Sequence, residues 1–160
     1  MKDMLSLSAH LPEVTFAPGD TVIEEGGQAG AMWILVSGAM HVYKGEVVVN
    51  IIAEPGAVIG EISLLLNANY GATVRAAEPT VLRFAEDGMA LLQSDPAITT
   101  FIATGLAQRL NLVTTYLVDL QHQYGDAPGL SIIPEVLRRL TSRQRPAART
   151  GSVRDPNPDY

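Results

Sequence analysis

The sequence predicts a mainly β fold with some α: a small antiparallel barrel of the jelly-roll type, followed by a long C-terminal helix. Two observations favour this fold class. Between residues 11 and 85, short apolar runs alternate with glycine-containing turns at intervals of about eight to ten residues, which is typical of small antiparallel sandwiches and barrels. After Pro96 nearly thirty residues then pass before Gly125 without a proline or a clear helix stop.

The expected strands are rich in β-branched and aromatic residues and are bounded by turns such as Pro18-Gly19-Asp20 and Glu54-Pro55-Gly56. Lys44-Gly45, between two such runs, predicts a tight hairpin turn. Strands are expected at 14–16, 21–23, 31–36, 39–43, 47–52 and 80–85, with a further one ending at Ala76.

The helical part is expected to begin with a short helix at 86–93. Ser94-Asp95-Pro96 is then a strong start signal for the long helix, at about 96–124. Six apolar residues on this helix are spaced 4, 3, 4, 3 and 4, a heptad seam that favours a two-stranded coiled coil and hence a homodimer. The alternative is an amphipathic helix packed on its own barrel. The seam residues are Leu106, Leu110, Val113, Leu117, Leu120 and Tyr124.

The composition favours one domain at 1–124 and an appendage at 125–160. The chain has 160 residues, and its apolar fraction of 47% is enough for a full core. Because it lacks cysteine, disulfides, thiolate metal sites and thiol nucleophiles are excluded. No apolar run approaches a membrane span, so a cytoplasmic location is the default expectation. Within the appendage, 132–140 is expected to form a short helix and the Arg/Pro-rich remainder to be disordered.

Charge is unevenly distributed along the chain. Residues 1–125 carry a net charge of −8, and residues 126–160 a net charge of +2 from six arginines and four acids. An acidic body is a poor partner for nucleic acid, and 35 residues after Gly125 are too few for a helix-turn-helix domain. The arginine-rich tail is therefore expected either to contact a protein partner or simply to be a solvated segment.

The stretch from Gly60 to Ala76 carries the chemistry. A glycine and a glutamate open a very short apolar helix, which a polar loop and a strand follow. Glycine allows close approach of backbone to a ligand, and free N–H groups at a helix start favour an anion. Glu61 can only accept hydrogen bonds, which suits the hydroxyl groups of a sugar. No arginine or lysine lies between Gly60 and Val74.

In order and spacing, several motifs together resemble the cyclic nucleotide-binding domain family, over roughly residues 11 to 120. The family includes the catabolite activator protein and the regulatory subunits of the cyclic-AMP kinase. The motifs are Phe16-Ala17-Pro18-Gly19-Asp20, Glu25-Gly26, Ser37-Gly38, Pro55-Gly56, Gly60-Glu61-Ile62-Ser63-Leu64-Leu65 and Ala72-Thr73-Val74-Arg75-Ala76.

The resemblance implies a phosphate-binding cassette within a double-stranded β-helix barrel. In that cassette Glu61 takes the ribose hydroxyl, while Gly60, Ile62 and Ser63 line the start of the short helix. The backbone of Gly71 and Ala72 meets the phosphate, beside Thr73. The long helix forms a lid over the base, which places Val113 and Thr114 near it. The implied ligand is cyclic AMP, cyclic GMP or a related anion, with no metal or other cofactor.

The sequence departs from the family pattern at one position. Asn69-Tyr70 stand where the family usually has Pro-Arg, whose arginine pairs with the cyclic phosphate. A neutral phenol donates a hydrogen bond worth about 0.5–1.5 kcal/mol, whereas a charge-assisted bond is worth about 1.5–3 kcal/mol. Affinity should therefore fall roughly tenfold to thirtyfold. Arg75 should face away, because strand side chains alternate, and Arg83 could help only if its strand passes the mouth of the barrel.

Catalysis is not expected, because no serine, threonine or lysine stands in a recognisable nucleophile constellation. The three histidines, His10, His41 and His122, are scattered and show no metal-ligand spacing. A haem sensor would have to use His41 as its axial ligand. The sequence therefore predicts a non-catalytic sensor domain; the alternative is a degenerate, ligand-free dimeric adaptor of the same fold.

Overall fold

The structure, a computed structural model, describes residues 3–125 and 127–141. Two compact units make up the chain: the first ends at Gly105 and the second begins at Leu106, so that the boundary falls within the long helix. The strands are β1 (Glu13–Phe16), β2 (Thr21–Ile23), β3 (Met32–Ser37), β4 (Met40–Lys44), β5 (Val47–Ile52), β6 (Val58–Ile59), β7 (Thr73–Ala76) and β8 (Thr80–Ala85). The helices are α1 (Met4–Leu7), α2 (Glu61–Leu65), α3 (Gly88–Ser94), α4 (Pro96–Tyr124) and α5 (Ile133–Thr141).

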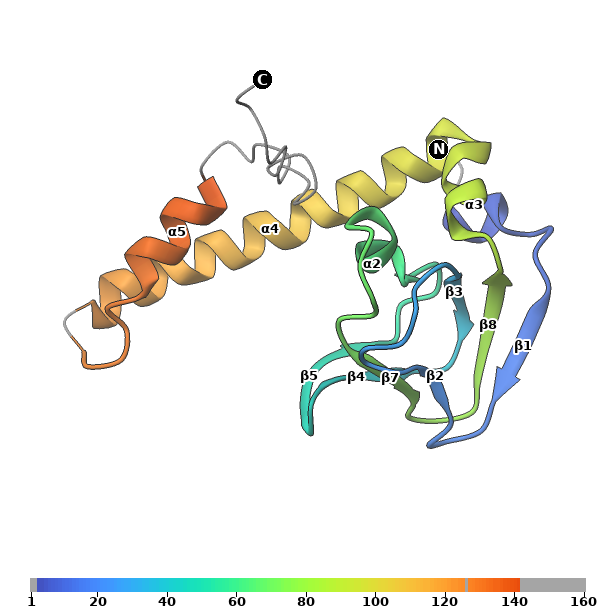
Figure 1. Ribbon diagram of the computed structural model, residues 1–160, viewed down its shortest axis with the longest axis horizontal. Helices are drawn as coiled ribbons and strands as arrows, with labels where there is room; N and C mark the ends of the chain where they lie inside the picture. Colours follow the sequence, from blue (N-terminus) through green and yellow to red (C-terminus); the bar gives the residue numbers. More distant parts are fainter. Residues whose placement is uncertain (1–2, 126, 142–160) are drawn as a thin grey trace, which may run out of the picture. The chain divides into compact units, whose positions relative to one another are not determined.

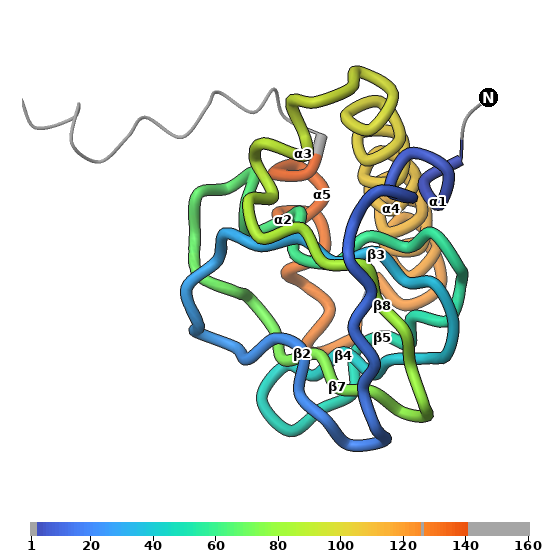
Figure 2. The backbone as a smooth tube through the Cα atoms, turned by 90° about the vertical axis from the view of Figure 1, so that its right-hand side faces the viewer, coloured from blue at the N-terminus to red at the C-terminus, as the bar shows by residue number. Residues whose placement is uncertain are grey.

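The eight strands form two four-stranded sheets, with the orders β1-β8-β3-β6 and β2-β7-β4-β5 (Figure 1). The antiparallel pairing is nested: β1 pairs with β8, β2 with β7, β3 with β6 and β4 with β5. An antiparallel ribbon rolled up in this way is a jelly roll, which confirms the predicted fold class. The continuous path in Figure 2 shows β1 running beside β8, although they lie at opposite ends of the barrel sequence.

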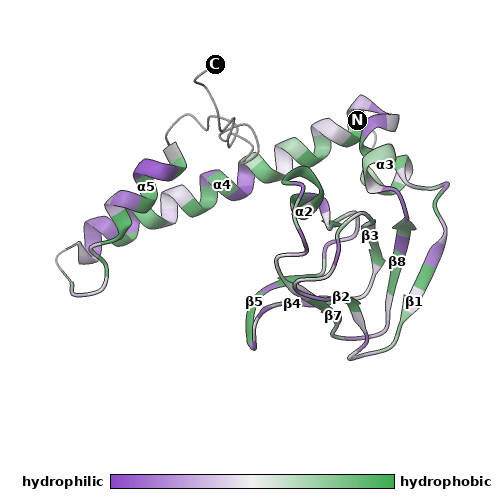
Figure 3. Ribbon diagram, viewed as in Figure 1, coloured by the Kyte–Doolittle hydropathy of each residue, from purple (hydrophilic) through white to green (hydrophobic). Residues whose placement is uncertain are grey.

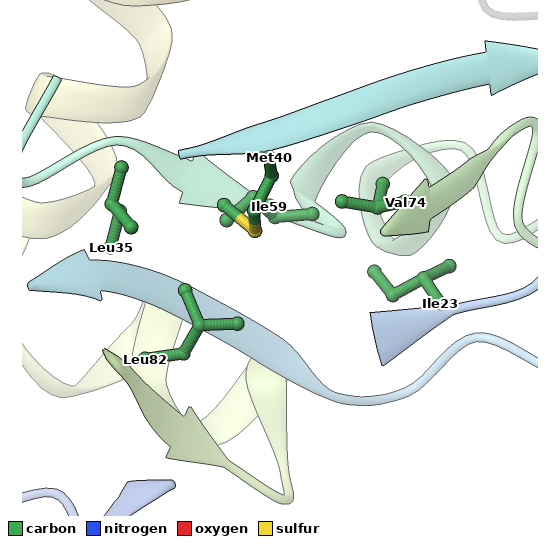
Figure 4. Packing of buried hydrophobic residues seen from close by; sticks show 6 residues of the cluster. All are labelled: Ile23, Leu35, Met40, Ile59, Val74 and Leu82. Atoms are coloured by element: carbon green, nitrogen blue, oxygen red, sulfur yellow. The ribbon is translucent and has the colours of Figure 1, made fainter. Parts of the chain in front are cut away.

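The core of the barrel takes one side chain from each of six strands (Figure 4). These residues are Ile23, Leu35, Met40, Ile59, Val74 and Leu82. All six are buried, and each such side chain contributes about 1.5–3 kcal/mol relative to an exposed position. Inward residues alternate with outward ones along each strand, so the core fixes which face every other side chain presents.

The turns follow the glycines in the predicted places. At Gly38, φ is +94°, and a Cβ atom there would lie 2.5 Å from the carbonyl oxygen of Pro79, so both the backbone conformation and the space require glycine. The predicted hairpin joins β4 to β5, with Gly45 at φ +59°. Lys44 is the last residue of β4, one position earlier than the turn itself. The short strand β6 was not predicted, because two residues carry no alternating pattern.

Helices α3 and α4 start at capping side chains. The carboxylate of Asp87 accepts a hydrogen bond from the Ala90 amide at 2.9 Å at the start of α3. Asp95 accepts one from the Ala97 amide at 2.8 Å, immediately before Pro96 opens α4. Such caps satisfy amides that have no partner within the helix. Both predicted helix starts are found to within two residues.

The second unit holds the rest of α4, followed by α5. The predicted long helix at 96–124 and short helix at 132–140 are found at 96–124 and 133–141. Glu135 on α5 forms ion pairs with Arg138 and Arg139, each at 2.8 Å. The tail was predicted to be disordered from Thr141 onward; Thr141 instead ends α5, and residues 142–160 lie outside the described residues. In the described ranges, no helix has both the length and the apolar character needed to cross a membrane.

Candidate functional site

The candidate site begins where Gly60 opens α2. Gly60 has a φ of +95°, and a Cβ atom there would lie 2.8 Å from the carbonyl oxygen of Ala31. Only glycine meets both conditions, and it lets the chain lie close to Ala31, the residue before β3. The next residue, Glu61, is 4% exposed, and Ser63 is also buried. A buried glutamate is uncommon unless it has partners, and Glu61 does interact within the fold.

The loop after α2 is held by backbone hydrogen bonds to the turn before β3. The Tyr70 amide donates to the carbonyl of Gly27 at 2.8 Å, and the Gly26 amide donates to the carbonyl of Tyr70 at 2.8 Å. A side-chain contact adds to these: the hydroxyl oxygen of Thr73 accepts from the Glu25 amide at 2.9 Å. Gly71, between these fixed points, therefore has a defined place at the open end of the sheet.

Tyr70 lies beside Gly60, as the cassette requires, but its hydroxyl points to protein. The hydroxyl donates to the carbonyl of Ala31 at 3.3 Å. The ring lies 3.6 Å from the Cβ position of Gly60 and 3.6 Å from that of Gly27. It also packs against the hydrophobic core. The residue in the usual arginine position thus acts here as a packing residue between α2 and the turn at 26–27.

The outward face of α2 is apolar. Ile62 is 48% exposed, Leu65 48% and Leu66 71%, and Figure 3 shows α2 and β5 drawn largely as hydrophobic. Of the predicted cassette residues, Glu61 and Ser63 turn inward, whereas Ile62 presents its side chain outward. Ile62 could therefore contribute only its backbone to a site at Glu61.

The two arginines weighed from the sequence are both engaged away from the loop. Arg75 is exposed, and its guanidinium carbon lies 5.3 Å from the centre of the Tyr43 ring. Arg83 donates to the carbonyl of Leu5, and also to Glu13 at 3.3 Å. Its strand β8 belongs to the other sheet. Neither arginine stands in for the missing cation.

A cation that the sequence reasoning missed does reach the loop. The Lys44 ammonium donates to the carbonyl of Gly71 at 2.6 Å and to the Glu25 carboxylate at 2.6 Å. The Gly45 amide donates to the other carboxylate oxygen of Glu25 at 2.9 Å. The Lys44 hydrogen bond, and after it the Gly45 amide, hold the pKa of Glu25 below its ordinary value. Alternation along β4 could have placed the Lys44 side chain on the same face of the strand as the inward Met40 and Val42.

The predicted lid and seam residues lie in the second unit. Val113 and Thr114 belong to this part of α4, as do all six seam residues. Leu110 is 43% exposed, Val113 48% and Tyr124 54%, so each retains apolar surface that a partner could cover. The roles of these residues as a lid and as a dimer seam stay predictions.

The histidines and acids do not gather into a metal site within residues 3–125 and 127–141. His41, the only histidine on the barrel strands, follows Met40 on β4 and points outward. Its ring lies 6.2 Å from that of Tyr43, the ring that Arg75 also covers.

Comparison with known proteins places this site in a family. Residues 13–88 match the family model of the cyclic nucleotide-binding domain. No curated protein sequence matches the chain significantly. Given the nested barrel, the short α2 and the buried glutamate, residues 13–88 belong to the cyclic nucleotide-binding domain family, as the sequence motifs predicted.

Three solved structures illustrate the likeness. The Thermus thermophilus catabolite activator protein is 24% identical with a TM-score of 0.60; the match covers 72% of this chain and 57% of that one. A structure from a cyclic-GMP-dependent pathway in bacterial phytopathogenesis is 25% identical with a TM-score of 0.57, covering 67% and 91%. The regulatory subunit of a cAMP-independent protein kinase A from Trypanosoma brucei is 25% identical with a TM-score of 0.54, covering 64% and 38%. The chain thus spans little more than half of the first of these proteins.

Proposed function

We propose that this domain is a non-catalytic sensor that binds a cyclic nucleotide, or a related anion carrying sugar hydroxyls, at Glu61. The observation that carries the proposal is the buried Glu61 directly after a left-handed Gly60, inside the segment that matches the family model. A carboxylate in a largely buried position accepts hydroxyl donors strongly, because water competes with them less.

The phosphate would lie at the Gly71-Ala72 backbone. In the part of the chain that the structure describes, neither of these two amides donates one of the turn or loop hydrogen bonds. They are thus available to an anion, next to a loop whose path is fixed by Tyr70. Tyr70 itself contributes packing rather than charge, so we expect weaker binding than in relatives that have an arginine there.

A bound ligand could be sensed through α2. A Cβ atom on Gly88, the first residue of α3, would lie 3.0 Å from the Leu64 side chain of α2. A movement of α2 would therefore displace α3. Asp95 ends α3 and directly precedes Pro96, the first residue of α4. We propose that α4 passes this change on through a homodimer, with the Arg-rich tail as a contact for a protein partner.

Calorimetric titration of the folded protein with cyclic AMP and cyclic GMP tests the sensor proposal. We expect saturable binding that Glu61→Gln weakens, since the amide is a poorer acceptor for hydroxyls. Glu54→Gln is the matched control, because Glu54 is an exposed turn residue of the same barrel. Absence of heat at millimolar nucleotide, with the protein shown to be folded by circular dichroism, would rule out the sensor function.

A second candidate is a ligand-free dimeric adaptor. The contact that favours it is the Tyr70 ring packed against Gly60, which fills space beside the cassette. The Trypanosoma structure is the regulatory subunit of a protein kinase A described as cAMP-independent, so the fold also occurs in a protein that does not depend on cyclic AMP. The adaptor predicts a partner that is captured by the full chain and lost when residues 126–160 are deleted, while the barrel stays folded. If the partner is still captured after this deletion, the tail is not the segment that binds it.

A further inference from the structure

Lys44 is placed by the barrel on the inner side of its sheet. Along β4, Met40 is fully buried and Val42 packs against the core, so Lys44, two residues further, shares their face. The residues between them, His41 and Tyr43, form the outward pair, with Arg75 over the Tyr43 ring. Lys44 therefore leaves the end of the strand on the side where the cassette loop lies.

The ammonium group of Lys44 already contacts that loop. A lysine ammonium has three donors, and two of them are used, by the Gly71 carbonyl and by Glu25. The Lys44 side chain is 60% exposed, so its remaining donor can be reached by a solute. The Gly71 carbonyl belongs to the same peptide group as the Ala72 amide, one of the two amides proposed to meet the phosphate. In a trans peptide these two groups point in opposite directions, so the flexible lysine stem must swing from the carbonyl side to the amide side to meet an anion there.

We propose that Lys44 supplies the positive charge of the anion site, in place of the arginine that the cassette lacks. This inference rests on the proposed function and adds to it the residue that recognises the anion. Without ligand, the Glu25 carboxylate and the Gly71 carbonyl hold the Lys44 ammonium; with ligand, the ammonium leaves both for the anionic oxygen of the phosphate. Unlike an arginine within the cassette, this cation comes from a hairpin 27 positions before Gly71.

The exchange is physically reasonable because the pair it breaks is weak. Exposed ion pairs contribute little to stability, and Lys44 and Glu25 are 60% and 33% exposed at their side chains. The Glu25 carboxylate keeps the Gly45 amide as a partner when the lysine turns away. Glu25 thus acts as a competitor for the lysine, and removing its charge should favour the ligand.

The test replaces two cationic side chains, which lie on opposite faces of one sheet, with glutamine. Lys44→Gln removes the inner charge, and Arg75→Gln removes an outer charge from neighbouring strand β7. Binding of cyclic AMP, and of adenosine as a probe without phosphate, is measured by calorimetry. We expect Lys44→Gln to weaken cyclic AMP binding about tenfold, as for loss of one charge-assisted hydrogen bond, and to leave adenosine binding unchanged. Arg75→Gln should change neither by more than about twofold.

Two further measurements complete the experiment. Glu25→Gln should tighten cyclic AMP binding, and Lys44→Arg should restore most of what Lys44→Gln loses, which also controls for folding. Equal effects of Lys44→Gln and Arg75→Gln, or equal losses for cyclic AMP and adenosine, would overturn the role of Lys44 while leaving the sensor function standing. If the unmodified protein binds neither cyclic AMP nor cyclic GMP at millimolar concentration, both proposals fall together.

Discussion

The hydroxyl of Tyr70 donates a hydrogen bond to the carbonyl oxygen of Ala31 at 3.3 Å, across 39 positions of sequence. This contact ties the phenol to the backbone just before β3, and the ring packs beside Gly60. The side chain that replaces the usual arginine has thereby become part of the packing around α2. We therefore expect substitutions of Tyr70 to affect both anion binding and the stability of the barrel, and to separate the two effects.

Tyr70→Arg should raise cyclic AMP affinity by roughly tenfold or more, because it restores a charge-assisted contact within the cassette. It should also lower the free energy of unfolding by about 0.5–3 kcal/mol, since the ring packing and the Ala31 contact are lost. Calorimetry and urea unfolding measure the two effects. Tyr70→Phe is the control: it keeps the ring, loses one hydrogen bond worth about 0.5–1.5 kcal/mol and should not alter affinity. A drop in affinity for Tyr70→Phe would mean that the hydroxyl turns toward the ligand.

Gly60→Ala should destabilise the barrel more than Gly19→Ala. Both glycines have a positive φ, near +90°, which costs about 1–3 kcal/mol for a residue with a side chain. Only at Gly60 would the added Cβ also meet backbone, the Ala31 carbonyl at 2.8 Å, whereas nothing lies within 4 Å at Gly19. Urea unfolding of both variants isolates the cost of the clash. Equal destabilisation would mean that α2 shifts freely to accept a side chain.

Acid should weaken the fold partly through Glu25. The Lys44 ammonium and the Gly45 amide hold the pKa of Glu25 below its ordinary value of 4.5. For an acid with a lowered folded pKa, the stabilisation is fully present above the unfolded value and is lost as pH falls through the folded value. Urea unfolding between about pH 6 and pH 3 should therefore show a shallower loss of stability for Glu25→Gln than for the unmodified protein. An equally steep loss of stability in Glu25→Gln and in the unmodified protein would contradict this role of Glu25.

The contact between Lys44 and Gly71 shows which features could not be predicted from the sequence. Glycine turns and alternating apolar residues are local signals, so the barrel, the hairpin at Gly45 and both helix starts could be predicted from them. Glu61 could be located because its motif is contiguous. Lys44 could not be assigned to Gly71 in this way, because their contact depends on the β4–β7 register. The Tyr70 contact with Ala31 was missed for the same reason, since a long-range packing partner leaves no mark in the surrounding sequence.

The heptad seam of α4 predicts a dimer that one substitution should disrupt. Leu110 lies on the seam and is 43% exposed, whereas Leu112 is 70% exposed and lies off the heptad positions. Leu110→Glu should place like charges against each other in a two-stranded coiled coil and shift the protein to monomer. Leu112→Glu introduces the same residue two positions away and should leave the dimer intact. Sedimentation equilibrium at tens of micromolar distinguishes the outcomes: a monomeric unmodified protein contradicts the seam, and dissociation by both variants would place the interface on a broader face of α4.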